Sequence, residues 1–300
     1  MNLSFHTKLV SIILPTHNRL SLLRITVESI LHQNDKHFEL IIVNDGSTDG
    51  TGDYLDSLQT DPQIRIIHQS NSGPALARNA GITAAKGDII VFTDDDCTVP
   101  PDWTEKIISG MKDGSINIIG GHVENGIEKN IYSSVSQETI NYFVIENARS
   151  DRSTSFLTSN NIAYRAALLR KWGGFEKSFK APGGEERALN MKLIARGARS
   201  KFDESIVVRH FHAMTLRSFV RQHLNYGAGS KILRTLARKD FPDQFPSISL
   251  SLYFRLLLKF LQSENGLLKG LLFIIGQIAV RIGFLKSNEL VSASNDDTSE

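Results

Sequence analysis

Four short apolar runs, separated by segments with helical spacing, constrain the fold of this chain more than any other feature. The runs are rich in Ile and Val and span Val10–Leu14, Leu40–Val43, Ile64–Ile67 and Asp88–Phe92. Continuous runs of this kind are typical of strands that are buried on both faces of a sheet. The segments between them carry apolar residues at helical spacing: Leu20–His32, Thr51–Leu58 and Pro74–Ala85. The alternation predicts an α/β fold with a doubly wound, mostly parallel, Rossmann-like sheet.

Polar, turn-rich segments follow each of these predicted strands. They begin at Pro15, Asn44, Gln69 and Asp94. Because ligands of open α/β sheets bind beyond the carboxyl ends of the strands, the four segments predict one site at one edge of the sheet. The chain lacks a glycine-rich dinucleotide fingerprint or a phosphate-binding G-x-x-x-x-G-K-[ST] loop after its first predicted strand. This absence argues against a nicotinamide-dependent oxidoreductase and a P-loop nucleotide hydrolase.

Composition and charge narrow the function further. The 300 residues are 41% hydrophobic, as in ordinary globular proteins, and the single cysteine, Cys97, excludes an internal disulfide and a cysteine-based zinc site. Residues 1–100 carry 7 basic against 12 acidic residues, a net charge of −5, whereas residues 196–286 carry 15 against 5, a net charge of +10. This division indicates a metal site followed by a segment that faces anions or a membrane, and it argues against a nucleic-acid-binding protein.

Three adjacent carboxylates, Asp94-Asp95-Asp96, follow the fourth predicted strand. Neighbouring carboxylates repel one another unless a cation lies among them. Oxygen ligands of this kind suit Mg²⁺ or Mn²⁺, ions that also bind substrate phosphates. The alternative is a solvated acidic loop or the start of a helix.

Six motifs in one order resemble a known family. They are SIILPTHNR (11–19), IIVNDGSTDGT (41–51), SGPALARNAGITAAKGDIIVFTDDD (72–96), SNNIAYR (159–165), WGGFEKSF (172–179) and GGEERALNMKL (183–193). Over residues 8–230 the chain resembles the GT-A glycosyltransferases of family 2. The resemblance implies a GT-A fold and a divalent cation. It also implies the inverting transfer of one sugar from a nucleotide diphosphate donor to an acceptor hydroxyl.

The resemblance also implies roles for individual residues. Nucleotide-binding residues would be Pro15, Thr16, Asn18, Arg19, Asp45, Arg78, Asp94 and Asp95. Metal ligands would be Asp94, Asp96 and His210, joined by His212 at strand spacing, and sugar or acceptor contacts would come from Asn161, Gly173 and Gly174. The residues themselves also allow Asp45 to be a simple turn residue, and Arg78 to be only the partner of a nearby carboxylate.

The family's Glu-Asp pair is replaced here by Glu185-Glu186. By resemblance Glu186 stands where the family places the Asp that deprotonates the acceptor, and the residues leave Glu185 open as the acting base. Two other functions also stay open: a nucleotide-sugar-binding protein with weak catalysis, and a sugar nucleotidyltransferase. The second would need a basic, glycine-rich loop after its first strand, and PTHNR is not one.

The second half of the chain has a weaker pattern and a distinct end. We expect extended segments at Ile116–Ile119, Phe156–Ala163 and Val207–His212, and a long helix over Thr215–Lys239. These complete a catalytic domain over 1–240, with a nucleotide-binding half at about 8–100 and an acceptor half at about 101–240. Residues 287–300 are expected to be a disordered tail.

Residues 245–286 combine basic and apolar residues as an amphipathic helix at a membrane interface does, with a break at Asn265-Gly266. We expect this segment to associate with a membrane or a second copy of the chain, docking on the chain's own core being the alternative. No secretory signal is recognisable, so the expected location is cytoplasmic, peripheral on the cytoplasmic face of the membrane. The expected partners are a nucleotide-sugar donor and a glycan or lipid-linked acceptor.

Overall fold

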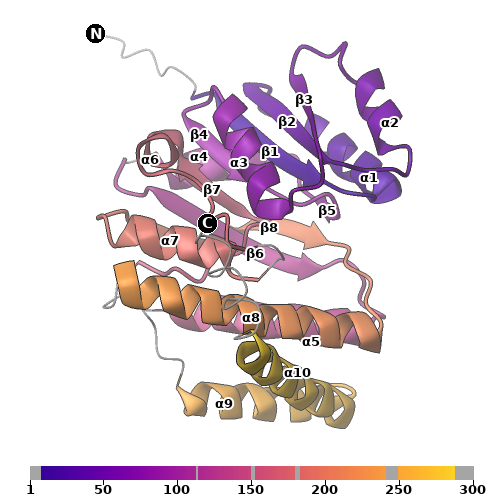
Figure 1. The fold of residues 1–300 in the computed structure, drawn as a ribbon, viewed down its shortest axis with the longest axis vertical. Coiled ribbons are helices and arrows are strands. Elements are labelled where there is room, and N and C mark those ends of the chain that lie inside the picture. Colours follow the sequence, from indigo (N-terminus) through magenta and orange to yellow (C-terminus); the bar gives the residue numbers. More distant parts are fainter. Residues whose placement is uncertain (1–7, 113, 150–152, 180–182, 241–248, 288–300) are drawn as a thin grey trace, which may run out of the picture.

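The computed structural model describes residues 8–112, 114–149, 153–179, 183–240 and 249–287. Its strands are β1 (Val10–Thr16), β2 (Phe38–Asp45), β3 (Ile64–Gln69), β4 (Ile89–Phe92), β5 (Cys97–Thr98), β6 (Ile118–Asn125), β7 (Ile162–Arg165) and β8 (Ser200–His210). They form one sheet of order β3-β2-β1-β4-β7-β6-β8-β5 (Figure 1). Strands β1 to β4 are parallel to one another, and so are β6 and β8, whereas β7 and β5 run antiparallel to their neighbours. The predicted α/β class and mostly parallel sheet are confirmed.

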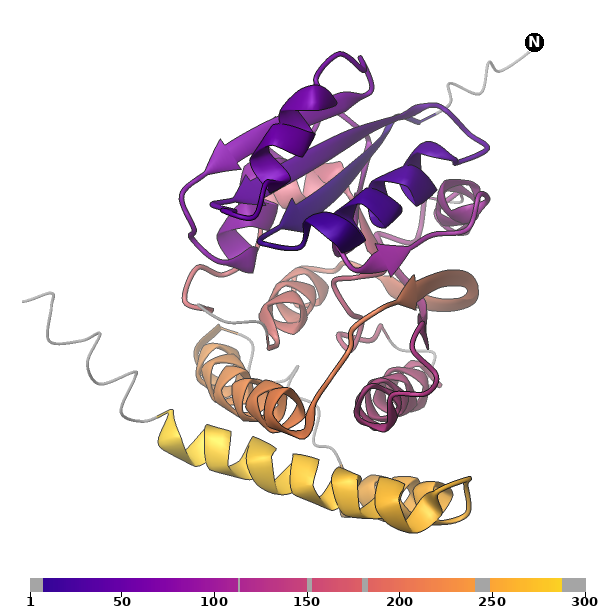
Figure 2. The ribbon, with the colours of Figure 1, turned by 90° about the vertical axis from the view of Figure 1, so that its right-hand side faces the viewer.

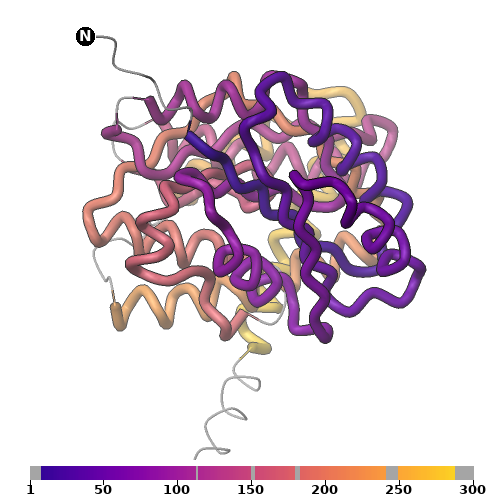
Figure 3. Tube along the Cα trace, turned by 90° about the horizontal axis from the view of Figure 1, so that it is seen from above, coloured from indigo at the N-terminus to yellow at the C-terminus, as the bar shows by residue number. Residues whose placement is uncertain are grey.

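Helices cover both faces of this sheet and extend below it. They are α1 (Leu20–Leu31), α2 (Thr51–Ser57), α3 (Pro74–Ala84), α4 (Trp103–Gly110), α5 (Ile131–Ala148), α6 (Ala166–Trp172), α7 (Glu185–Ile194), α8 (Leu216–Asp240), α9 (Leu250–Leu261) and α10 (Gly266–Lys286). Residues of α1, α2 and α4 pack on one face of the sheet, and residues of α3, α6 and α7 pack on the other. The N-terminal elements and the C-terminal helices lie at opposite ends of the long axis, so the view from above in Figure 3 shows the first in front of the second.

The second half departs from the expected strands in two places. In the expected extended segment Phe156–Ala163, pairing with β4 and β6 begins only at Ile162. Several of the residues before it line a cavity instead. Strand β8 begins at Ser200, well before the expected Val207, because residues 200–203 pair with residues 118–121 of β6, ahead of a register shift between Gly121 and His122. Exposed polar residues give no apolar pattern from which such a strand start could be predicted.

The C-terminal helices pack closely on α8. A Cβ atom on Gly227 of α8 would lie 2.0 Å from the carbonyl oxygen of Val280, and one on Gly283 of α10 would lie 2.0 Å from the carbonyl oxygen of Leu224. Two glycines therefore let the backbones of α8 and α10 touch. Apolar residues of α5, α8, α9 and α10 form a shared core below the sheet, and Figure 2 shows α10 running beneath α5 and α8. The inner face of α9 and α10 therefore packs on the rest of the chain, which was the alternative expected for this segment.

The outer face of α9 and α10, here called the outer apolar face, is exposed. It consists of Leu250, Phe254, Leu258, Leu261, Leu267, Leu268, Leu271, Ile274, Ile278, Ile282 and Leu285. By length and composition alone, α10 could cross a membrane: it has 21 residues, and an 18-residue window within it has a mean hydropathy of 1.8. Large exposed apolar surfaces are uncommon on soluble monomers.

We expect Gly227→Ala to lower Tm, because its Cβ must displace backbone of α10. Overpacking of this kind costs about 1–3 kcal/mol, or roughly 2–4 °C in Tm for each kcal/mol. Gly52→Ala is the matched control. A Cβ there would meet nothing closer than 3.8 Å, and alanine is the better helix former, so Tm should not fall. Equal Tm values for the wild type and Gly227→Ala in thermal unfolding would show that α10 does not pack on α8 in this way.

Candidate active site

One cavity of about 720 Å³ lies beyond the carboxyl ends of β1, β2 and β4, at the edge predicted from the sequence. Its walls come from both halves of the chain. The N-terminal half contributes residues that the sequence predicted: Pro15, Thr16, Arg19, Asp45, Arg78, Asp94, Asp95 and Asp96. The second half contributes Glu185, Glu186, His210 and His212, and the C-terminal helices add Tyr253, Gln277 and Val280. The last three carry no motif, so only the packing of α9 and α10 shows that they belong to the cavity.

Asp96 and two histidines form the metal-binding candidate. The Nε2 atom of His210 lies 3.2 Å from Oδ1 of Asp96, and Nδ1 of His212 lies 3.4 Å from Oδ2. The backbone holds the two segments together, since Phe211 N–H donates to the carbonyl of Asp96 at 2.7 Å and Cys97 of β5 pairs with His210. Because residues two apart on an extended strand face one side, both imidazoles point at the same carboxylate.

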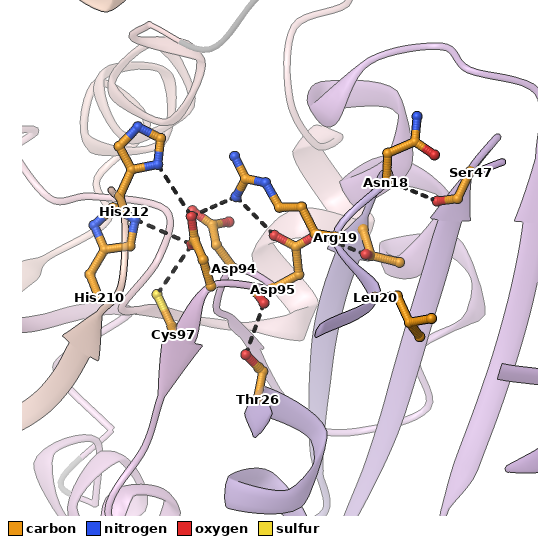
Figure 4. Close-up of polar contacts among 12 residues, drawn as sticks. Asn18, Arg19, Leu20, Thr26, Ser47, Asp94, Asp95, Cys97, His210 and His212 are labelled. Atoms are coloured by element: carbon orange, nitrogen blue, oxygen red, sulfur yellow. Dashed lines mark hydrogen bonds and ion pairs between the residues drawn. The ribbon is translucent and has the colours of Figure 1, made fainter. Parts of the chain in front are cut away.

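Arg19 lies on the other side of the aspartates from His210 and His212 (Figure 4). Its Nη1 atom donates to Asp95 Oδ1 at 3.1 Å and also to Asp96 Oδ2. Thr16 Oγ1 donates to the other oxygen of Asp95 at 2.7 Å. Asp95 is therefore held by the chain itself and supports the position of Arg19 at the cavity wall.

The two neighbouring aspartates differ in acidity. Burial raises the pKa of Asp95 to about 6, although Arg19 opposes the shift. Burial also acts on Asp96, but hydrogen bonds from His210 and His212 and the charges of His210 and Arg19 together hold its pKa well below the ordinary value. Asp96 thus stays ionised at neutral pH, as a metal ligand must.

The donor set of this group fits a divalent cation. One ligand atom from each of Asp96, His210 and His212 lies within 4.8 Å of the others. A carboxylate with two imidazoles suits first-row divalent ions such as Mn²⁺. Asp94 lies outside this group, because its Oδ1 atom accepts a hydrogen bond from Arg78 at 2.8 Å.

Arg78 connects the two halves of the site. Its guanidinium is buried and donates from Nη2 to Asp94 and from Nη1 to Glu185 Oε1 at 3.0 Å. Burial lowers the pKa of Arg78, but Asp94 and Glu185 raise it by more, so the residue stays charged. The other oxygen of Glu185 accepts the backbone N–H of Gly183 at 2.9 Å. Glu185 is fully engaged in holding the first turn of α7.

Glu186 is the carboxylate that remains available. It lines the cavity, and within the described residues its side chain accepts no hydrogen bond from another residue. Burial raises the pKa of Glu186 to about 8, and the neighbouring Glu185 adds to the shift. A carboxyl group with a raised pKa is a stronger base once it has lost its proton, and the free oxygen of its ionised form can then take a proton from a bound hydroxyl. Of the two candidate bases, the geometry favours Glu186.

Two residues that the resemblance assigns to nucleotide binding, Asp45 and Asn18, hold loops at this end of the sheet in place. The carboxylate of Asp45 accepts from Gln69 Nε2 at 2.7 Å and from the backbone N–H groups of Ser72 and Gly73 at 2.8 and 2.9 Å. Asp45 thus fixes the turn that opens α3 while lining the cavity. Asn18 does not line the cavity. Its Oδ1 accepts the N–H of Thr48 at 2.7 Å, which ties the loops after β1 and β2 together.

The residues expected to contact the sugar or acceptor, Asn161, Gly173 and Gly174, do not line the cavity. Asn161 is 1% exposed. Its Oδ1 atom accepts from Trp103 Nε1 at 3.0 Å, and its Nδ2 donates to the carbonyls of His122 and Ile206 at 2.8 and 2.9 Å. The preceding Asn160 lines the cavity instead, and its buried Oδ1 has no partner among the described residues.

The two glycines lie away from the cavity, at the end of α6. Gly173 has a φ of 79° and ends the helix, which explains why glycine stands there. Gly174 leaves room for Asn79, since a Cβ at that position would lie 2.1 Å from Asn79 Oδ1. Both glycines therefore shape the junction of α6 with α3.

We expect stability to depend on pH through Glu186. In the unfolded chain this carboxyl loses its proton near the ordinary pKa of 4.5, whereas in the folded protein it keeps the proton to about pH 8. The folded state then binds the extra proton, so stability falls as pH rises through this window. Glu186→Gln removes the titration. Its Tm should nearly equal that of the wild type at pH 5 and exceed it by several degrees at pH 8.5.

The exposed Glu176 provides the control for this experiment. Glu176→Gln should unfold like the wild type at both pH values. If the difference between Glu186→Gln and the wild type stays constant from pH 5 to 8.5, Glu186 is not held in its neutral form.

Comparison with known proteins supports a glycosyltransferase. The chain is 26% identical over 236 residues to the pre-mycofactocin glycosyltransferase of Mycobacterium tuberculosis, and the match covers 74% of this chain and 46% of that protein. It therefore spans about half the length of that curated relative. It is 34% identical over 121 residues to glycosyltransferase GlyG of Streptococcus pneumoniae, 40% of either chain.

Solved structures show the same fold. The mannosyltransferase PcManGT from Pyrobaculum calidifontis, in complex with GDP-Man and Mn²⁺, has a TM-score of 0.65 at 17% identity, covering 94% of this chain and 88% of that one. S. aureus TarS 1–349, in complex with UDP, has a TM-score of 0.54 at 14% identity, covering 95% and 91%. These neighbours are GT-A glycosyltransferases. The model of the family described as glycosyl transferase family 2 matches residues 11–173, more than half of the chain, and the chain therefore belongs to that family.

Proposed function

We propose that this glycosyltransferase moves one sugar from a nucleotide diphosphate donor to an acceptor hydroxyl, with inversion at the anomeric carbon and with a divalent cation. The observation that carries the proposal is one cavity that holds both the Asp96–His210–His212 group and the free carboxylate of Glu186. A volume of about 720 Å³ is ample for a nucleotide-sugar. The ligands of the two structural neighbours, GDP-Man with Mn²⁺ and UDP, support this class of donor.

At the donor end, Asp96, His210 and His212 would hold Mn²⁺ or Mg²⁺. The bound cation would supply positive charge to the leaving diphosphate. Arg19 is fixed beside the group by Asp95 and offers a second cation to the same phosphates. Asp45 and Pro15 lie at the end of the cavity formed by the loops after β1 and β2, where we place the nucleobase of the donor.

At the acceptor end, Glu186 would take the hydroxyl proton. Arg78 orients it indirectly: by holding Glu185 it fixes the first turn of α7, on which Glu186 stands. Inversion needs the base and the leaving diphosphate on opposite sides of the sugar. The placement of Glu186 on α7 and of the metal group on β8 and the loop after β4 is consistent with that arrangement.

Asp96→Asn should weaken Mn²⁺-dependent binding of the donor by at least about tenfold, because it removes the negative charge of the carboxylate that faces both imidazoles in the candidate metal group. A panel of UDP- and GDP-sugars, titrated by calorimetry with Mn²⁺ and with a chelator, measures the effect and identifies the nucleobase of the donor. His32→Ala is the control, since His32 lies on the surface of the molecule and contacts only the carbonyl of Glu28. Unchanged affinity and turnover in Asp96→Asn would remove the metal assignment.

Glu186→Gln should lower kcat by about 10²- to 10⁴-fold, the usual contribution of a general base. Donor affinity should stay nearly unchanged, because the donor contacts lie elsewhere. Glu186→Asp should keep much of the activity. In the wild type, kcat/KM should rise with pH up to about 8, as the carboxyl loses its proton.

Glu185→Gln separates the two glutamates. It should lower Tm, since Arg78 loses a charged partner, while the remaining folded enzyme still turns over. Loss of turnover in Glu185→Gln together with an active Glu186→Gln would make Glu185 the base. A protein that binds the donor but shows neither transfer nor hydrolysis would be a binding protein.

The outer apolar face supports a further part of the proposal, peripheral attachment to a membrane. Lys259 and Arg281 stand beside that face, where they can contact anionic headgroups, whereas Lys269 is paired with Glu138 on the inner side. The enzyme would then work on the cytoplasmic face of the membrane, on a glycan or lipid-linked acceptor of the cell envelope.

Flotation with phosphatidylglycerol vesicles tests the attachment. The double variant Leu271→Asp/Ile278→Asp should lose binding, and wild-type binding should weaken in high salt because the basic residues act through screened attraction. Ile25→Asp is the control, as Ile25 is similarly exposed on α1, away from the C-terminal helices. If the wild type forms a dimer that does not bind vesicles, and the double variant is a monomer, the outer apolar face binds a second copy of the chain instead.

A further inference from the structure

Arg187 is a cavity residue that the proposed reaction does not use. It follows Glu186 on the first turn of α7 and lines the same cavity. Its guanidinium carbon lies 4.0 Å from the centre of the Phe156 ring. In the part of the chain that the structure describes, the side chain makes no hydrogen bond and no ion pair, and its Nε atom is buried without a partner.

Two other arginines of the cavity, Arg78 and Arg19, are paired. Arg78 contacts Asp94 and Glu185, and Arg19 contacts Asp95 and Asp96. The acidic side chain next to Arg187 is Glu186, and burial raises the pKa of Glu186 to about 8, so this neighbour is mostly neutral at pH 7. Burial lowers the pKa of Arg187 itself only to about 10, and the guanidinium stays charged. Arg187 is half-buried and lines the cavity, and its guanidinium has no ion-pair partner among the described residues, so it is open to an anion that binds in the cavity.

The ring in contact with this cation belongs to a cluster of three aromatic side chains. Phe156 lies before β7, Phe143 belongs to α5 and Tyr253 belongs to α9. The ring of Phe143 lies 5.9 Å from that of Phe156 and 5.2 Å from that of Tyr253. One side of the Arg187 guanidinium thus faces an aromatic cluster that includes Tyr253 of the C-terminal helices. A ligand held here would place an anionic group on the guanidinium and an apolar or ring-shaped part against these rings.

We propose that Arg187 binds an anionic group of the acceptor, a phosphate ester or a carboxylate, close to the hydroxyl that is glycosylated. The proposal rests on the proposed function, because it takes Glu186 as the group that faces this hydroxyl. A guanidinium binds either anion through two parallel hydrogen bonds, which fixes the orientation of the acceptor as well as its affinity. Arg187 is then a specificity-determining residue that selects anionic acceptors over neutral ones.

Binding of small anions to the full chain tests the proposal without the donor or the reaction. The probes are inorganic phosphate, phenyl phosphate, acetate and benzoate, titrated by calorimetry in the presence of a chelator. Arg187→Met, which keeps the length of the side chain, should weaken binding of the phosphate probes or of the carboxylate probes by at least about tenfold, and the class affected identifies the anion. Phenyl phosphate or benzoate should bind more tightly than its small counterpart, because of the aromatic rings.

Two further variants make the result specific. Arg221→Met removes an exposed arginine that also lines the cavity, and should leave the affinity for these probes unchanged. Arg187→Lys should recover part of the affinity. Arg187→Met should also unfold at a Tm no lower than the wild type, since it removes a half-buried cation that has no ion-pair partner among the described residues, and its Mn²⁺-dependent donor affinity should be normal.

Three outcomes would overturn the proposal. One is the absence of binding of all four probes to the wild type. Another is a loss of affinity in Arg221→Met but not in Arg187→Met. The third is a lower Tm in Arg187→Met with unchanged anion affinity, which would make the arginine a structural partner of Phe156. Failure of the proposed function would appear instead in the donor titrations of Asp96→Asn, which do not depend on Arg187.

Discussion

The buried guanidinium of Arg78 is the contact on which the rest of the site depends. It stands on α3 and joins Asp94, at the end of β4, to Glu185, at the start of α7. These two carboxylates are 91 positions apart in the sequence, and no strand pairing links their segments. Removing one partner of a buried ion pair typically costs about 3–5 kcal/mol, because it leaves a charge without compensation. The position of Glu186 and Arg187 in the cavity therefore depends on this one side chain.

Local surroundings give similar carboxyl groups different roles. Asp96 is kept ionised by two imidazoles and Arg19, while burial raises the pKa of Asp95 to about 6 and that of Glu186 to about 8. Separated pKa values of this kind allow a metal ligand, a positioning residue and a proton acceptor to lie in one cavity at one pH. The sequence shows five acidic residues in two short runs, and only the partners of each in the folded chain distinguish them.

The sequence predicted the N-terminal half of the fold well, since buried parallel strands are continuous apolar runs and the polar segments after them must meet at one edge. It failed where a single residue decides which way a side chain points. Asn160 and Asn161 are neighbours in an irregular segment, and only the carbonyls of His122 and Ile206 show that Asn161 points away from the cavity. Likewise, the choice between Glu185 and Glu186 depends on Arg78, more than 100 positions away, which no local pattern reveals.

The contact of α10 with α8 places a single helix between the cavity and the outer apolar face. Gln277 and Val280 line the cavity, while Ile274, Ile278 and Ile282 of the same helix are exposed on the outside. A helix is a rigid element about 10 Å across, and glycine contacts with α8 leave it little room to move alone. Anything that shifts α10 from the outside must also change the shape of the cavity. By thermodynamic linkage, a ligand in the cavity that favours one position of α10 must change the affinity of the outer face by the same factor.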